Sequence, residues 1–253
     1  MSKVFLKELA HDAHKYSHGT VGVIAGSRAY SGAAVLCVGG ARRGGSGYIT
    51  YLSQDRLPTL LVLSAYPDVV VRKKISQVSV DAWVIGSGSP TLRRNFQIPL
   101  SRFAVLDASA MTLSREINAE VVVITPHHGE AEKLGFPVGA DRSSRITAAL
   151  KMAKHFEAYV LLKGEETVIA SPYGAHLTNA VGGPELATAG TGDVLAGLLG
   201  SLLASWRPET DSEIMGVIDK AVSMHALAGK LASSKISPIT ATDLLKALGK
   251  VGR

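Results

Sequence analysis

Cysteine is almost absent from this sequence, because Cys37 is the only one among 253 residues. A disulfide framework and a cysteine-based metal site are therefore both excluded. Aromatic residues are also scarce, at 6% of the chain, and the basic residues stand in scattered pairs rather than in one run. Nucleic-acid binders commonly cluster basic residues and add aromatic platforms. Although the net charge is +6, we expect no nucleic-acid partner, because binding of a small polyphosphate explains the excess equally well.

Long apolar runs are lacking as well. No stretch approaches the ~20 consecutive apolar residues that a membrane-spanning helix needs, and the N-terminus has no apolar signal-peptide core. We therefore expect a cytoplasmic protein without membrane contact. The length and the 46% hydrophobic content are sufficient for a full core, and we expect residues 1–253 to form a single domain.

Short β-branched runs alternate with helix-like segments along the chain. This alternation predicts an α/β fold of three layers (αβα), with a doubly wound, mostly parallel sheet. The expected strands are residues 21–25, 48–52, 82–85, 104–106, 121–124 and 159–162. The expected helices are residues 33–43, 143–157, 194–205 and 213–232. Residues 168–170 and 175–178 are expected to form a hairpin near one edge of the sheet.

Polar or glycine-containing segments follow five of the predicted strands. In open parallel sheets, ligands bind beyond the carboxyl ends of the strands, so we expect these segments to converge on one crevice. Loops are generally polar, which accounts for one or two such segments more readily than for five. The segments are residues 26–27, 86–89, 107, 125–130 and 163–167.

A glycine turn leads into the most apolar predicted helix. Gly190 and Gly192 allow bare backbone to approach a ligand, and the first N–H groups of the helix lack internal partners, so the turn can bind a phosphate oxygen. Asp193 lies in the first helical turn, where the helix dipole favours an ionised carboxylate that can accept a proton from a hydroxyl. Local capping by Thr191 is the alternative, and this segment alone does not decide between the two.

Several common site patterns are missing. The sequence has no Walker-type phosphate loop. Gly86 and Gly88 begin a possible dinucleotide fingerprint, but Thr91 stands where the third glycine is needed. His127 and His128 are adjacent rather than one helical turn apart, which disfavours a zinc-binding helix. A Rossmann dehydrogenase and metal ligation by these histidines are therefore both disfavoured.

Seven short segments occur in the order typical of one family. They read HKYSHGTVGVIAGSRAYSGA, GGSGYIT, DASA, TPHHGE, LKGEET, GTGDVLAGLLG and MHALAG. Together they resemble the ADP/ATP-dependent NAD(P)H-hydrate dehydratases of the ribokinase-like superfamily, from His14 to about Leu248. Many members carry an additional epimerase domain, which we do not expect here.

The resemblance implies a repair reaction. The S-form hydrates of NADH and NADPH (NADHX and NADPHX) would be dehydrated with ADP or ATP, through phosphorylation of the ring hydroxyl and elimination of phosphate. Mg²⁺ is expected with the nucleotide, although no ligand for it is assigned, and a homotetramer is expected. The alternative is a kinase of the same fold that acts on a vitamin precursor or a sugar.

The resemblance also implies roles for individual residues. Asp193 is the implied catalytic base. The hydrate-binding set is Ala33, Gly88, His127 and Asp193, and the nucleotide-binding set is Lys163, Gly164, Glu165, Glu166, Thr167, Gly190, Thr191 and Gly192. Two neighbours are given structural roles instead: Glu130 is interpreted as a helix-start carboxylate, and His225 as a packed histidine near the nucleotide pocket.

Four positions depart from the family's usual residues. Ala189 replaces the glycine before the GTGD core, and Gly183 replaces the asparagine of the approach to that core. Ser109 stands where a second acid is common, and Lys230 where an aspartate is common. The first two changes touch the expected anion turn, so they put its geometry and the nucleotide affinity in question.

Overall fold

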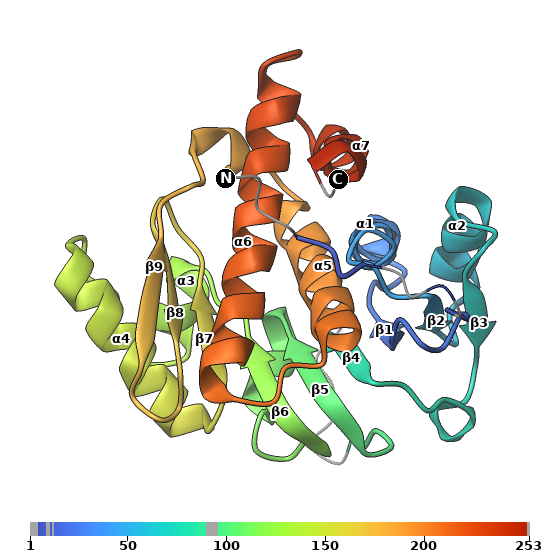
Figure 1. Cartoon of the computed structure of the whole chain (residues 1–253), viewed down its shortest axis with the longest axis horizontal. Helices are drawn as coiled ribbons and strands as arrows, with labels where there is room; N and C mark the ends of the chain where they lie inside the picture. The colour runs from blue at the N-terminus through green and yellow to red at the C-terminus, as the bar shows by residue number, and fades with distance from the viewer. Residues whose placement is uncertain (1–4, 9–10, 12, 90–95, 252–253) are drawn as a thin grey trace.

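The computed structural model describes residues 5–8, 11, 13–89 and 96–251. Thr91, at which the dinucleotide fingerprint fails, lies outside these residues. One sheet of nine strands runs through the molecule in the order β3-β2-β1-β4-β5-β6-β7-β8-β9 (Figure 1). The strands are β1 Thr20–Ile24, β2 Tyr48–Leu52, β3 Val70–Arg72, β4 Ala82–Ile85, β5 Ser101–Leu106, β6 Ala119–Ile124, β7 Tyr159–Leu162, β8 Thr167–Ala170 and β9 His176–Asn179. Neighbours from β3 to β7 pair in parallel, whereas β8 pairs antiparallel with both β7 and β9.

Helices flank this sheet. They are α1 Ser31–Ala41, α2 Arg56–Ala65, α3 His128–Lys133, α4 Arg142–Phe156, α5 Thr191–Trp206, α6 Asp211–Ser233 and α7 Ala241–Val251, with short 3-10 turns η1 Ile75–Gln77, η2 Ala108–Leu113 and η3 Pro184–Leu186. The predicted doubly wound, mostly parallel sheet and its edge hairpin are confirmed. Two predicted helices run past their observed ends: α1 ends at Ala41, before the predicted Arg43, and Glu157 ends α4 in the left-handed conformation, with φ of 51°.

Adjacent residues on the central strands pack into opposite cores. In β4, Val84 joins a core with α1, α5, α6 and α7, while Trp83 and Ile85 join a second core that includes residues of α4. A strand that is buried on both faces must be apolar at every position, which explains the unbroken apolar runs in the sequence. The two cores place the helices in layers on either side of the sheet.

Helix α5 is the buried centre of the first layer. Its backbone touches that of α1, because a Cβ atom added at Gly197 would overlap the carbonyl oxygen of Cys37, and one added at Gly40 would overlap that of Val194. Figure 1 shows α5 over the middle of the sheet, between α1 and α6. This close packing fixes the first turn of α5 relative to the strand ends. Among the described residues, no helix has both the length and the apolar character needed to span a membrane.

The strand order reverses at β1. This strand pairs with β2 on one side and with β4 on the other, and the chain builds outward from it in both directions. The residues that directly follow β1 and β4 therefore lie beside each other at this reversal, which is the usual ligand position in such sheets. The Gly26 amide donates to the Ser87 carbonyl oxygen at 2.7 Å across this point.

We expect Gly197→Ala to lower the free energy of unfolding by about 1–3 kcal/mol, because the added methyl group overlaps the backbone of α1. Gly216→Ala in α6 is the matched control, since a Cβ there meets nothing within 4 Å. It should raise stability by up to about 1 kcal/mol through better helix propensity. Urea unfolding of both variants measures the difference, and equal effects would contradict the close packing of α1 and α5.

Candidate functional site

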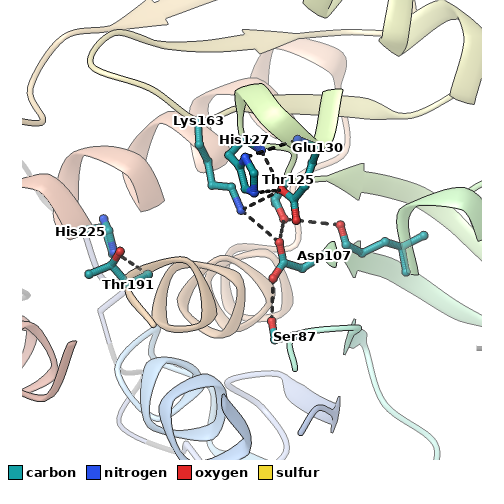
Figure 2. Close-up of polar contacts among 9 residues, drawn as sticks. Ser87, Asp107, Thr125, His127, Glu130, Lys163, Thr191 and His225 are labelled. Atoms are coloured by element: carbon teal, nitrogen blue, oxygen red, sulfur yellow. Dashed lines mark hydrogen bonds and ion pairs between the residues drawn. The ribbon is translucent and has the colours of Figure 1, made fainter. Parts of the chain in front are cut away.

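The carboxyl ends of four neighbouring strands meet at Asp107, which directly follows β5. The Ser87 hydroxyl donates to its Oδ2 at 2.9 Å, and the Thr125 hydroxyl donates to its Oδ1 at 2.7 Å. The Lys163 ammonium lies 3.2 Å from the same Oδ1. Figure 2 shows these three contacts converging on the carboxylate. The structure therefore brings the polar segments after β4, β5, β6 and β7 together, and the Gly26–Ser87 hydrogen bond adds β1.

Asp107 and Lys163 form a largely buried ion pair. Their side chains are 7% and 20% exposed. Burial opposes the charge on Asp107, but Lys163 and the two hydroxyls outweigh it and hold its pKa below the usual value. Burial also opposes the charge on Lys163, but Asp107 and Glu130 outweigh it and raise its pKa. Both groups are therefore charged at neutral pH.

The backbone after Asp107 is strained. Ala108 has φ of 48°, in the left-handed region that costs a residue with a Cβ roughly 1–2 kcal/mol. Its position at the end of β5 turns the chain directly into η2. The packing of the strand ends compensates this cost and holds the Asp107 carboxylate in its place.

The glycine turn (residues 190–192) lies against Lys163. Gly190 is the N-cap of α5 with φ of 90°, a conformation that favours glycine. A Cβ atom added at Gly192 would lie 3.4 Å from the Lys163 Nζ, so the ammonium lies beside the first turn of the helix. The positive end of the helix dipole and a lysine charge thus face the same space.

Capping by Thr191, the alternative drawn from the sequence, is wrong. Gly190 occupies the cap position, and the Thr191 hydroxyl donates backward to the carbonyl oxygens of Leu186 and Thr188, both at 2.9 Å. The hydroxyl therefore ties the approaching chain to the helix. Ala189 precedes the cap without a positive φ, so the backbone places no requirement for glycine at that departure from the family pattern.

The expectation that the helix dipole keeps Asp193 fully ionised is also wrong. Burial, followed by the negative charge of Asp107, raises the pKa of Asp193 to about 7, and Lys163 only partly opposes this. The dipole is a weak effect beside burial next to a second carboxylate. A carboxyl group with this pKa is well matched to accept a proton at neutral pH.

A cavity of about 810 Å³ opens beside the glycine turn. Seven of the sequence-predicted site residues line it: His127, Lys163, Gly164, Glu165, Thr167, Thr191 and Gly192. Gly183, one of the departures from the family pattern, lines it as well. Apolar side chains such as Leu186, Leu195 and Val222 form the rest of the wall, so the cavity suits a ligand with one flat apolar part and one charged part.

The other predicted residues lie elsewhere. Glu166 forms an ion pair with Arg142 at 3.2 Å. Gly190 packs so closely against the Leu36 side chain that a Cβ atom on it would overlap that side chain. Ala33 and Gly88 are neighbours at the reversal of the strand order, where a Cβ atom on Gly88 would overlap that of Ala33. Of the predicted hydrate-binding set, Ala33 and Gly88 therefore lie outside the cavity, whereas His127 lines it with the predicted nucleotide-binding residues.

The charge of Asp193 acts on Lys163 and on Cys37. Its charge contributes to the raised pKa of Lys163, beside the cavity, although less than those of Asp107 and Glu130. It also acts on Cys37 of α1, whose thiol pKa is raised first by burial and then by Asp193 and Asp107. Cys37 is buried in the middle of α1, and Asp193 itself is not among the residues that line the cavity.

The two residues given structural roles hold those roles. His127 and Glu130 form a reciprocal capping box at the start of α3, in which the Glu130 carboxylate accepts from the His127 amide at 2.8 Å. His225 is buried, and its Nε2 lies 2.9 Å from the Thr191 carbonyl oxygen (Figure 2). Burial lowers the pKa of His225 to about 4, so the ring is neutral and donates this hydrogen bond.

Sequence reasoning missed Arg145. This α4 side chain donates to the carbonyl oxygens of Lys163 and Glu166, at 3.3 and 3.2 Å, and so shapes the loop between β7 and β8. A Cβ atom on Gly164 would overlap its guanidinium, which explains the glycine after Lys163. The regular helical pattern of α4 gave no sign that one of its arginines serves this loop.

Within the described part of the chain, no group of three or more His, Cys, Asp or Glu side chains is placed to hold a metal ion. Mg²⁺ commonly binds through one or two carboxylates together with substrate phosphates. The described residues therefore do not form a dedicated metal cage, and they fit only an ion that the phosphates of a nucleotide hold.

The proteins that this chain resembles agree with the geometry of the site. A family model described as NAD(P)H-hydrate dehydratase matches residues 21–250. The chain belongs to the NAD(P)H-hydrate dehydratase family. It is 33% identical to the ADP-dependent (S)-NAD(P)H-hydrate dehydratase of Neisseria meningitidis serogroup B, over 83% of this chain and 77% of that protein.

A solved structure confirms the fold of the family. The ADP/ATP-dependent NAD(P)H-hydrate dehydratase from Bacillus subtilis, co-crystallised with ATP/Mg²⁺, matches with a TM-score of 0.81 and 27% identity, covering 96% of this chain and 92% of that one. The predicted ribokinase-like architecture is thereby borne out. The bifunctional NAD(P)H-hydrate repair enzyme of Mycobacterium leprae is 36% identical over 90% of this chain, which spans 48% of that protein. The chain thus spans about half the length of several curated relatives that it matches.

The raised pKa of Asp193 predicts a pH-dependent effect of Asp193→Asn on stability. The folded state binds this proton more tightly than the unfolded state, so the contribution of Asp193 is complete below pH 4 and is lost as the pH rises through 7. An asparagine has no such dependence. We expect the Tm of the variant minus that of the parent to increase from pH 4 to pH 8 in thermal unfolding. A constant difference would contradict the burial of this carboxyl.

Proposed function

We propose that this protein dehydrates the S-form hydrates of NADH and NADPH back to the reduced cofactors, with ADP or ATP as phosphoryl donor. Membership of the family and the likeness to an ADP/ATP-dependent dehydratase support the reaction class. The observation that carries the mechanism is the position of Asp193: it directly follows the glycine turn, and its charge acts on Lys163.

In the first step, the ring hydroxyl oxygen attacks the terminal phosphorus of the nucleotide. A new O–P bond forms, the bond from phosphorus to the leaving nucleotide oxygen breaks, and Asp193 accepts the hydroxyl proton. The Lys163 ammonium and the backbone amides of the glycine turn neutralise charge on the phosphoryl oxygens. A carboxyl with a pKa of about 7 accepts this proton and releases it again near neutral pH.

In the second step, the phosphate group leaves the ring. The lone pair of the ring nitrogen expels it, and loss of a proton from the neighbouring carbon restores the double bond. This elimination requires little from the protein beyond holding the ring in place and keeping phosphate in a positive environment. Phosphorylation by the nucleotide thus converts the hydroxyl, a poor leaving group, into phosphate, a good one.

The two separate places suit the two substrates. A cavity of about 810 Å³ lies within the range of about 300–1,000 Å³ that is usual for small-molecule sites, and its apolar wall suits the base of an adenine nucleotide. The crevice beside Ala33 and Gly88 would receive the hydrated ring, with His127 near its edge. We propose this arrangement because Ala33 and Gly88 pack together outside the cavity, while Lys163 and the glycine turn line it.

Three further proposals accompany this function. Mg²⁺ would enter on the phosphates of the nucleotide, where it would screen their charge. The chain would act as one ribokinase-like domain in a homotetramer, by similarity to the family. The lack of a membrane-spanning helix among the described residues is compatible with action in the cytoplasm.

The reaction itself is tested with chemically hydrated NADH and each nucleotide in turn. We expect recovery of the absorbance of the reduced ring, together with one free phosphate for each ring repaired. The same assay separates the two candidate reactions, because a kinase would accumulate a stable phosphorylated product. Such a product, without recovery of the reduced ring, would overturn the dehydratase function.

We expect Asp193→Asn to lower kcat by about 100- to 10,000-fold, the usual contribution of a general base, while nucleotide binding persists. Binding should persist because the substitution keeps the size of the side chain and removes only a charge. Calorimetric titration with ADP measures binding, and the hydrate assay measures turnover. Turnover within a few-fold of the parent would refute the role of Asp193.

A further inference from the structure

Asp107 is at the centre of the site, yet it does not line the 810 Å³ cavity. Its side chain is 7% exposed, and its two oxygens accept from Ser87, Thr125 and Lys163. A residue in this position cannot bind the nucleotide directly. It can therefore affect the reaction only through its neighbours: Lys163, which reaches the cavity, and Asp193, whose pKa its charge raises.

Lys163 is the first of these neighbours. It lines the cavity, and its Nζ lies 3.2 Å from Asp107 on one side and faces the position of a Gly192 Cβ at 3.4 Å on the other. An ammonium has three N–H donors. Asp107 accepts one of them, and Glu130, with its Oε2 at 3.8 Å, lies beyond hydrogen-bond distance. Donors therefore remain for an anion at the glycine turn.

We propose that Asp107 is a positioning residue, which holds the Lys163 ammonium against the glycine turn where it meets the phosphoryl group in transfer. The inference rests on the proposed function, because it specifies how one charge of that site is held. A lysine side chain has four rotatable bonds and would otherwise sample many positions in the cavity. The fixed carboxylate holds the ammonium in position before the nucleotide binds. This preorganised charge is what phosphoryl transfer requires.

Asp81 provides a matched control. It precedes β4 at the opposite end of the sheet, accepts from the Thr20 amide and hydroxyl, each at 2.8 Å, and pairs with Arg207 at 3.4 Å. Asp81 and Asp107 therefore each accept from a hydroxyl group and each pair with a cationic side chain. Only Asp107 is near the cavity. Substitution of either by asparagine keeps the acceptor oxygen and removes the charge.

The test measures kcat and KM for Asp107→Asn, Lys163→Met, the double variant and Asp81→Asn. We expect Lys163→Met to lower kcat about 100-fold and Asp107→Asn at least about 10-fold, with little change in KM for the hydrate. At a pH high enough to ionise Asp193 in every variant, Asp107 acts only through Lys163, so the double variant should be no slower than Lys163→Met alone. Asp81→Asn should keep the kcat of the parent, and all rates are taken well below the Tm of each variant.

A pH profile adds a readout that a merely structural role would not move. Without the Asp107 charge, the acid limb of kcat/KM should shift to lower pH, because that charge raises the pKa of Asp193. A kcat for Asp107→Asn within about threefold of the parent would overturn the inference. So would a double variant whose loss equals the product of the two single losses.

Crystal structures of the parent and of Asp107→Asn test the positioning independently of the reaction. We expect the Lys163 ammonium beside Gly192 in the parent and displaced from it in the variant, and an unmoved ammonium would overturn the inference. If the parent fails to repair the hydrate, the proposed function fails, and these structures still decide whether Asp107 holds Lys163. If the parent and Asp107→Asn repaired the hydrate equally fast, only the inference would be refuted.

Discussion

The buried ion pair between Asp107 and Lys163 is the interaction on which the rest of the site depends. Removing two charges from water costs several kcal/mol for each ion, and attraction repays this only when the remaining oxygens are satisfied. The hydroxyls of Ser87 and Thr125 satisfy them here, at 2.9 and 2.7 Å. Four neighbouring strand ends are thereby joined, and the same negative charge adds to the effect of burial, which together raise the pKa of Asp193 to about 7. The Asp107 carboxylate thus both joins the strand ends and acts on the proposed catalytic base.

The position of helix α5 links this pair to the chemistry. Backbone contact at Gly197 fixes the helix against α1, so its first turn stays at the wall of the cavity, which Thr191 and Gly192 line. Gly190 begins the helix in a conformation that favours glycine, and the Lys163 ammonium lies beside Gly192. A proton acceptor, a positive charge and unpaired amides are therefore gathered in one turn of helix.

The sequence predicted the parts of the fold that depend on local pattern. Apolar β-branched runs identified the buried parallel strands, whereas β3 is only three residues long and α2 exposes Leu57, Leu60 and Leu61 in place of a clear buried stripe, so neither was predicted. The strand-end segments of the site were also recognisable. The raised pKa of Asp193 was not, because it depends on a carboxylate 86 positions away in the sequence, and the contact of Arg145 with the β7–β8 loop was missed for the same reason.

The central claim is that Asp193 is a partly buried acid that shares its surroundings with the Asp107–Lys163 pair. Titration of the side-chain carboxyl carbons of aspartate by NMR, from pH 3 to pH 9, measures this most directly, with Asp193→Asn used to assign the resonance. The account predicts one resonance, absent from the variant, that titrates near pH 7. An Asp193 resonance that titrates near pH 4, like that of an aspartate in water, would contradict it.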